Sequence, residues 1–190
     1  MEPKPGEVVP SDCPSDFLRL TGTAAGYIRL TEGGMAIAIS VRGGRIQQLV
    51  MNSKTYPDRL FFLGGVDSMR GFLADSLVPE DIAQEIINPT NPENKLTIDQ
   101  VRIRGGDVFI NPRLELRIPV SGIWEWGFFL DTGNVWVEPE KFNPFALRYA
   151  AGAGLRVGTP IGPIAFDYGF NLMRRDWESR GNFHFSIGLF

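Results

Sequence analysis

Residues 61–72 read FFLGGVDSMRGF, an apolar segment that carries an arginine, Arg70, near its end. The segment lies inside the longest part of the chain without a strand pattern, roughly residues 47–106. Aromatic and aliphatic side chains stand on both sides of Arg70, and a loop this apolar is not expected to remain in water. The sequence therefore predicts a long loop that folds inward against the rest of the chain.

The segments on either side of this loop alternate apolar and polar residues, which is the pattern of β-strands with one face in an apolar environment. In each segment the charged residues share one face, and the opposite face carries no charge between the turns. Within the loop, Pro79 followed by Glu80 and Asp81 predicts a short helix over residues 79–87. Seven strands are expected, at residues 18–30, 35–42, 108–120, 124–136, 147–157, 164–172 and 183–189.

The segment WEWGFFLDTGNVW, residues 124–136, separates the two faces clearly. Its tryptophans suit the interfacial girdle of a transmembrane β-barrel, and strands of roughly 9–12 residues fit a tilted membrane span. A soluble β-sandwich or lipocalin-like barrel has the same alternation, so the aromatic ends and the polar, glycine-rich opposite face favour the membrane. We assign to the lipid side Trp124, Trp126, Phe128, Leu130 and Trp136, and to the lumen Glu125, Gly127, Phe129, Asp131 and Gly133.

The connections between the predicted strands alternate between short turns, such as TEGG and TPIGP, and long loops. Outer-membrane barrels have short periplasmic turns and longer extracellular loops, so the Arg70 loop is expected to be extracellular. The sequence thus predicts an all-β, antiparallel transmembrane barrel, or part of one, with about seven or eight strands. A complete bacterial barrel normally has an even number of strands. With seven strands, either residues 1–15 cross once more, which their composition argues against, or the chain is the C-terminal part of a larger barrel. Residues 1–15 are expected to be an unpaired lead-in, and residues 16–190 the C-terminal barrel portion.

The composition excludes several classes of function. The net charge of −3 gives no basic footprint for nucleic acid. Cys13 and His184 are each the single residue of their type, so we expect no disulfide, metal site or cofactor. The sequence contains no run of about 18 apolar residues, so no transmembrane helix is predicted. The first residues, MEPKPGEVVP, lack the basic head and apolar core of a signal peptide, so we expect an outer-membrane precursor to carry a signal that is absent from this chain.

No catalytic residues are predicted. A polar barrel interior commonly carries carboxylates, and four are expected to face it: Glu115, Glu125, Asp131 and Asp167. The glycines of Gly152-Ala-Gly154 lie in mid-strand with no following helix, which excludes a phosphate loop. They are expected to let the strands curve or to let bulky lumen contents approach closely.

The predicted lumen offers partners for Arg70, because a guanidinium can bind a carboxylate through two hydrogen bonds. We predict Asp131 as the first partner of Arg70 and Glu115 as the second. Phe129 shares the face of Asp131 two residues away, and it is placed to stack on the guanidinium.

Four motifs, in this order along the chain, resemble the BamA/TamA superfamily, the bacterial surface-antigen family that includes outer-membrane assembly factors and two-partner-secretion transporters. RGF, preceded by FLGGVDS, resembles the family's loop motif, and FFLDTGNVW its Phe-x-Asp-x-Gly strand motif. GAGLRVGTPIGPIAFDYGF is similar to the next hairpin, and FHFSIGLF to the terminal barrel signal, although Phe190 follows Leu189 directly and falls on the inward face. The residues that carry the loop and terminal motifs are Gly64, Gly65, Arg70, Gly71, Phe72, Phe183, Phe185, Ile187, Gly188 and Phe190.

This resemblance implies a barrel of about 16 strands in the bacterial outer membrane, with Arg70 contacting the Asp131 strand from inside. It also implies periplasmic POTRA domains and earlier strands, which we expect to be missing from this chain. The implied function is non-enzymatic insertion or export of β-rich proteins, with outer-membrane lipid and a client β-barrel or secreted protein as partners. The alternative is a stand-alone or homo-oligomeric pore formed by edge-to-edge strand pairing; a small barrel enzyme using His184 is a third possibility.

Overall fold

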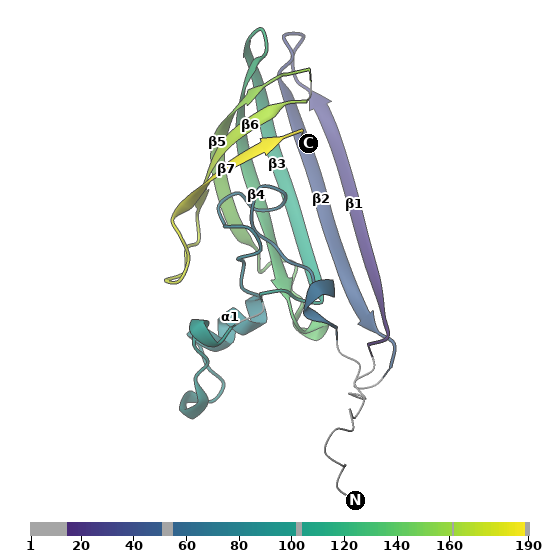
Figure 1. Ribbon diagram of the computed structural model, residues 1–190, viewed down its shortest axis with the longest axis vertical. Helices are drawn as coiled ribbons and strands as arrows, with labels where there is room; N and C mark the ends of the chain where they lie inside the picture. Colours follow the sequence, from purple (N-terminus) through teal and green to yellow (C-terminus); the bar gives the residue numbers. More distant parts are fainter. Residues whose placement is uncertain (1–14, 51–54, 102–103, 161, 189–190) are drawn as a thin grey trace, which may run out of the picture.

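The computed structural model describes residues 15–50, 55–101, 104–160 and 162–188 (Figure 1). Their seven strands form one antiparallel sheet in which each strand pairs with the next along the chain, so β1 and β7 are its two edges. The strands are β1 (Phe17–Arg29), β2 (Ala36–Gln48), β3 (Val108–Ser121), β4 (Trp124–Trp136), β5 (Arg148–Val157), β6 (Ile164–Asn171) and β7 (Gly181–Ile187).

The sheet curves around the long β2–β3 connection, as part of a barrel wall does (Figure 1). The short hairpin turns lie at one end of the sheet, and the long connections lie at the other, together with the helix α1 (Glu80–Ile87). Short 3-10 turns occupy Pro57–Arg59, Pro92–Asn94, Ile98–Gln100 and Pro139–Lys141. Among the described residues, no helix has the length and apolarity needed to span a membrane.

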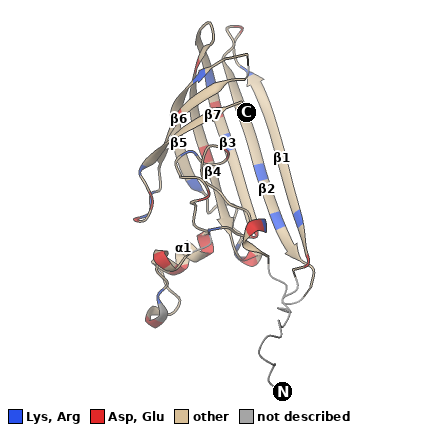
Figure 2. Ribbon diagram, viewed as in Figure 1, with Lys and Arg blue, Asp and Glu red and all other residues tan. Residues whose placement is uncertain are grey.

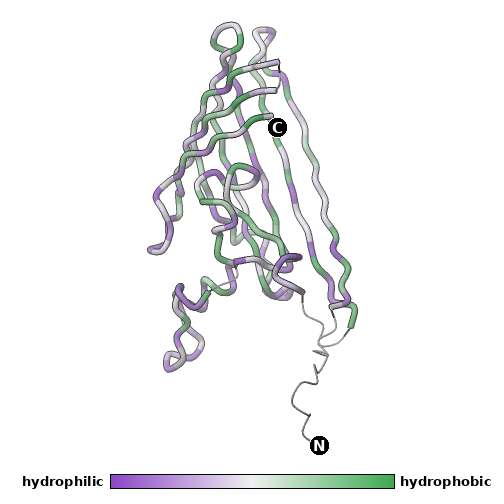
Figure 3. Tube along the Cα trace, viewed as in Figure 1, coloured by the Kyte–Doolittle hydropathy of each residue, from purple (hydrophilic) through white to green (hydrophobic). Residues whose placement is uncertain are grey.

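The alternation of side chains along the strands confirms the predicted all-β, antiparallel architecture. Figure 3 shows apolar and polar residues alternating along the strand traces. The outward positions of β4 are exposed and apolar through Leu130, whereas Gly127, Phe129 and Asp131 are buried on the inner side. All seven predicted strands are present, and the helix predicted over residues 79–87 begins at Glu80, with Pro79 as its N-cap.

Two details of the predicted faces are wrong. β2 was expected to end at Arg42, but its ladder with β3 continues to Arg45, which pairs with Val108. Arg45 therefore lies exposed on the outward side of a face that was expected to be free of charge. Trp136 was assigned to the lipid, yet it is only 1% exposed, because the β4–β5 connection covers it and places the ring of Phe142 at 4.9 Å between centroids.

The hydrophobic core lies inside the curve of the sheet, between the strands and the β2–β3 loop. The two ends of the β2–β3 loop meet at an isolated β-bridge, where Phe61 and Gly106 exchange a reciprocal pair of backbone hydrogen bonds of 2.9 Å. The core confirms that the loop folds inward. It combines Phe61, Leu63, Met69, Phe72 and Leu77 of the loop with the inward-facing Ile46, Phe109, Val135 and Ala150 of four strands.

Candidate functional site

A tight turn within the loop presents Arg70 to the sheet. Gly64 and Gly65 adopt φ values of 122° and 88°, which favour glycine. A Cβ at Gly64 would lie 2.2 Å from the carbonyl oxygen of Leu73, so the close return of the chain also requires glycine. Ser68 closes the turn, since its hydroxyl accepts from the amide of Gly64 at 2.8 Å and donates to the Gly64 carbonyl at 3.0 Å.

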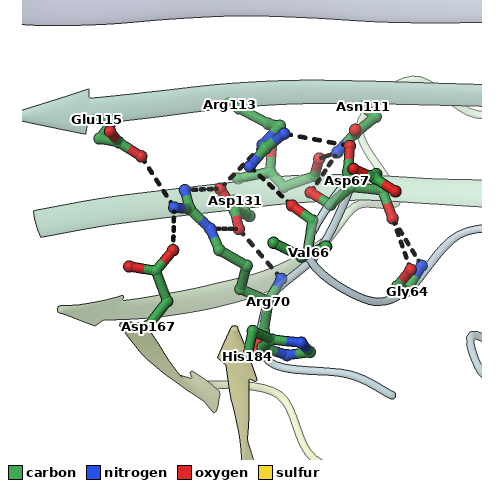
Figure 4. A network of polar contacts seen from close by, with 12 residues as sticks. Gly64, Val66, Asp67, Arg70, Asn111, Arg113, Glu115, Asp131, Asp167 and His184 are labelled. Atoms are coloured by element: carbon green, nitrogen blue, oxygen red, sulfur yellow. Dashed lines mark hydrogen bonds and ion pairs between the residues drawn. The ribbon is translucent and has the colours of Figure 1, made fainter. Parts of the chain in front are cut away.

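Arg70 binds Asp131 of β4 through three hydrogen bonds. Its Nε and Nη2 donate to the two carboxylate oxygens at 2.7 and 2.8 Å, and its backbone N–H donates to Oδ2 at 3.1 Å (Figure 4). The guanidinium carbon lies 3.5 Å from the centroid of the Phe129 ring. The fork of the guanidinium thus fits Asp131 bidentately, with one face covered by an aromatic ring.

Two further carboxylates complete the coordination of Arg70. Its Nη1 donates to Glu115 of β3 at 2.8 Å and to Asp167 of β6 at 3.1 Å. Figure 4 shows the guanidinium between these carboxylates and Asp131. A single loop side chain therefore connects three strands of the sheet, two of which, β4 and β6, are not neighbours.

Three arginines of the wall balance the carboxylates. Arg113 binds Asp131 at 3.2 Å, Arg117 binds Glu115 at 2.8 Å, and Arg156 binds Glu115 at 2.8 Å and Asp167 at 3.3 Å. Arg113 also donates to the carbonyls of Asp67 and Val66 in the loop. We call these seven charged residues the lumenal cluster: Arg70, Arg113, Arg117, Arg156, Glu115, Asp131 and Asp167.

The centre of the lumenal cluster is deeply buried. Arg70 is 2% exposed and Asp131 is fully buried. Charges removed from water in this way are tolerated only when they are paired and hydrogen-bonded. The loss of Arg70 would leave three carboxylates facing one another with fewer cations.

Glycines in the facing strands make room for the cluster. A Cβ at Gly127 would lie 1.8 Å from Nη1 of Arg156, and one at Gly154 would lie 1.7 Å from Oδ1 of Asp167. A Cβ at Gly152 would lie 2.4 Å from the ring of Phe129. The close approach expected at Gly152 and Gly154 thus involves side chains of the wall itself.

The other residues singled out in the sequence lie in separate places. Phe72 is buried in the core, and Gly71 packs against Ala150 of β5. Gly133 lies beside Ile110 and Asn111 of β3, two residues beyond Asp131 in β4. In the terminal motif, Phe183, Phe185 and Ile187 are exposed and Gly188 has φ +70°, while Phe190 lies outside the described residues.

Sequence reasoning did not connect Arg70 with Asp167, Arg156, Arg113 or Arg117. The signal was present, because all four lie at inward positions of their strands and Asp167 stands opposite Gly154 in the β5–β6 register. It also missed Asn111, whose side-chain amide donates to the carbonyls of Ser68 in the loop and Thr132 in β4.

A second group of charges ties the long connections together at their end of the sheet, where Figure 2 shows acidic residues gathered on and around α1. Arg175 of the β6–β7 connection donates to both oxygens of Glu80 at 2.8 and 2.9 Å, and Asn134 of β4 donates to Glu80 at 2.8 Å. Arg148 binds Glu178 at 2.6 Å. We call Glu80, Arg148, Arg175 and Glu178 the loop-end cluster.

The space inside the curved sheet is not completely filled by side chains. A cavity of about 690 Å³ lies between the Arg70 loop and the inner faces of β1–β3, and Thr23, Tyr27, Ser40 and Arg42 line part of it. The described residues contain no group of His, Cys, Asp and Glu side chains that could hold a metal ion. The site is therefore a braced protein wall beside a polar space.

Comparisons with known proteins agree on one family. A family model described as the Omp85 superfamily domain matches residues 7–190. The chain is 26% identical over 181 residues to the outer envelope protein 80 of Arabidopsis thaliana chloroplasts, covering 91% of this chain and 20% of that protein. It is 32% identical over 136 residues to the outer membrane protein assembly factor BamA of Nitratidesulfovibrio vulgaris, covering 68% of this chain and 15% of that protein.

A solved structure resembles the fold. The crystal structure of BamA from Haemophilus ducreyi lacking POTRA domains 1–3 has a TM-score of 0.69 and 22% identity, covering 90% of this chain and 34% of that one. The chain thus spans about a fifth or less of the length of the curated relatives that it matches.

Proposed function

Because the chain belongs to the Omp85 superfamily and forms part of an outer-membrane β-barrel, we propose that it acts in the insertion or export of β-rich proteins. In this proposal residues 16–190 are the barrel portion, and the Arg70 loop enters the lumen from the extracellular side. Outer-membrane lipid surrounds the wall, and the partner is a client β-barrel or a secreted protein. No covalent bond is made or broken.

The observation that supports the proposal best is the anchoring of the loop. A pore or a structural barrel needs no buried arginine that binds carboxylates of three different strands at 2.7–3.1 Å. A barrel that must change its wall while keeping its shape does need an internal brace. In this proposal the lumenal cluster keeps β3, β4 and β6 together while another part of the wall rearranges.

The part that rearranges is an edge of the sheet. β1 and β7 each have one strand neighbour among the described residues, so each leaves backbone donors and acceptors on its other side. An incoming client strand cannot satisfy its own backbone in lipid. Pairing with such an edge would supply the missing hydrogen bonds, which is strand addition by a templating edge.

The test is the rate at which a client folds. The full-length protein is reconstituted in lipid vesicles, and a urea-unfolded eight-stranded outer-membrane barrel is added as the probe. We expect the wild type to accelerate folding over empty vesicles and Arg70→Ala to lose most of the acceleration, whereas Arg59→Ala, at an exposed arginine outside both edge strands, retains it. Equal rates for wild type and empty vesicles would contradict the proposal.

The alternative is a homo-oligomeric pore closed by edge-to-edge pairing. The two edges are unequal, because β1 has 13 residues and β7 has 7. A ladder between β7 of one copy and β1 of another would therefore leave about half of β1 unpaired. A stable dimer in detergent together with ion conductance of the same preparation would favour this alternative over the assembly role.

A further inference from the structure

The last strand, β7, touches the Arg70 loop through side chains that have no part in the lumenal cluster. Asn182 Nδ2 donates to the carbonyl oxygen of Gly71 at 2.8 Å. The ring nitrogen Nε2 of His184 lies 2.7 Å from the carbonyl oxygen of Arg70, and because a carbonyl only accepts, Nε2 must carry the hydrogen. Two alternate residues of β7 thus hold two consecutive carbonyls of the loop (Figure 4 shows the His184 contact).

An independent steric feature lies at the same place. Gly169 of β6 pairs with Asn182 in the sheet register. A Cβ at Gly169 would lie 2.3 Å from the carbonyl oxygen of Arg70 and 2.8 Å from the amide nitrogen of Gly71. The Arg70–Gly71 peptide therefore lies flat against β6, within reach of the β7 side chains, only because residue 169 has no side chain.

The spacing of the two donors determines what movement of β7 would do. Asn182 and His184 point inward together because they are two residues apart, and a slip of one residue would turn both outward. A slip of two residues would leave the loop with one donor at most. The two hydrogen bonds therefore specify one register of β7, which pairs along only seven residues.

We propose that Asn182 and His184 are positioning residues that latch the last strand to the Arg70–Gly71 backbone. The side chain of Arg70 holds β3, β4 and β6, and its main chain holds β7, so release of the strand and release of the loop are coupled. The coupling is a property of the chain itself; its use, to keep β7 in place until a client strand arrives, rests on the proposed function.

The first experiment measures the coupling in both directions by hydrogen exchange of the full-length protein in lipid nanodiscs. We expect Arg70→Ala to increase exchange of the amides of residues 181–187 by about tenfold or more, equivalent to about 1.4 kcal/mol. We expect the double variant Asn182→Ala with His184→Ala to increase exchange of residues 68–72 to a similar extent. Ser186→Ala is the matched control, because Ser186 is the next inward residue of β7 and is more deeply buried than Asn182 and His184.

Two single substitutions separate the latch from a general loss of packing. His184→Gln keeps an N–H donor on a side chain of similar reach, so it is expected to restore most of the protection that His184→Leu loses. Gly169→Ala keeps both donors, but its Cβ would occupy the space where the Arg70–Gly71 peptide packs against β6, so it should release the loop. Gly26→Ala of β1 is its control, since a Cβ there would have no atom within 4 Å.

The outcomes are distinct. Unchanged exchange of β7 in Arg70→Ala, or a double variant that behaves like Ser186→Ala, would overturn the latch. If the double variant does not fold, Gly169→Ala and the glutamine rescue decide instead: failure of both to act as stated would also overturn it. Coupled exchange in a protein that does not accelerate client folding would support the latch and contradict the proposed function alone.

Discussion

The lumenal cluster and the loop-end cluster use the same chemistry in different surroundings. In both, an arginine donates to both oxygens of one carboxylate, through Nε and Nη2 in Arg70 and through Nη2 alone in Arg175. In the lumenal cluster every side-chain partner of the Arg70 guanidinium is a strand residue on the inner face. The loop-end cluster instead joins two connections that are far apart in the sequence, β2–β3 and β6–β7, to the start of β5. The lumenal cluster is a brace, because it holds strands of the wall together. The loop-end cluster is a clasp, because it holds the long connections together at one end of the sheet.

The difference has an energetic side. The side chains of Arg70 and Asp131 are 3% and 0% exposed, and those of Arg175 and Glu80 are 12% and 11%. A broken pair costs more where neither member can return to water. The lumenal cluster is therefore expected to determine global stability, and the loop-end cluster to determine local order at one end of the sheet.

The largest effect is expected from Arg70→Ala. The substitution leaves Asp131, Glu115 and Asp167 buried with less compensation, and we expect it to lower the free energy of unfolding by about 3–5 kcal/mol. The measurement is urea unfolding of the detergent-refolded protein, followed by tryptophan fluorescence. Arg29→Ala, an arginine of the exposed β1 edge, should change little. A loss for Arg70→Ala no greater than that of the control would show that the cluster braces nothing.

The next effect is expected from Arg175→Ala. Glu80 then loses its cation but keeps hydrogen bonds from Asn134 and Gln84, so the cost is smaller, about 1–3 kcal/mol. It should appear as faster hydrogen exchange in α1, with the transition of the whole sheet almost unchanged. The control is Arg174→Ala, because the neighbouring Arg174 reaches only a backbone carbonyl, at 3.4 Å. Destabilisation of the whole sheet by Arg175→Ala would remove the distinction between the brace and the clasp.

The same contrast explains what the sequence could predict. Strand residues follow a period of two, so the inward position of Asp131 and Glu115 follows from parity, and with it their choice as partners of Arg70. The apolar residues around Arg70 predict that the loop turns inward. The ends of the strands were predictable to within a few residues, because the alternation of side chains continues wherever a strand pairs. β2 is the exception: the two glycines after Arg42 interrupt the alternation, although the strand goes on pairing with β3 to Arg45.

The loop-end cluster could not be predicted in this way. Glu80, Arg175 and Glu178 lie in connections without periodicity, and their contacts depend on where each long connection folds back. The burial of Trp136 belongs to the same class: its parity is outward, but the ring of Phe142 from the next loop covers it. The hydrogen bonds that β7 side chains donate to the loop could not be predicted either, because they depend on where the main chain of the loop lies, and the pattern of side chains does not determine that position.

A third effect is the pH dependence of the loop-end cluster. Burial alone would raise the pKa of Glu80, but hydrogen bonds from Gln84 and Asn134 and the charge of Arg175 outweigh it and hold that pKa below its ordinary value of 4.5. A carboxyl whose pKa is lower in the folded state stabilises the fold at higher pH. Its contribution is complete above about 4.5 and is lost as the pH falls through the pKa of the folded state.

A spin label at Ile87, an exposed position at the end of α1, can follow this loss. In a chain with Cys13→Ser and Ile87→Cys, label mobility should rise as the pH falls below 4.5. In the chain that also carries Glu80→Gln, the label should be mobile already at neutral pH, and its mobility should change little as the pH falls. Identical profiles for the two chains would assign the acid sensitivity to another group.

The smallest effect is expected at Lys141, and it tests whether burial, rather than bond length, separates these sites. Lys141 Nζ lies 2.8 Å from Glu138, the same distance as Arg70 from Glu115. Both members of the lysine pair are more than half exposed, so water and salt compete with the contact and the ordering of two long side chains offsets it. Lys141→Ala should leave urea unfolding and exchange in α1 unchanged within error, at low and high salt. An effect as large as that of Arg175→Ala would mean that an exposed contact and a buried contact of similar length contribute equally, and the ranking of the two clusters by burial would be wrong.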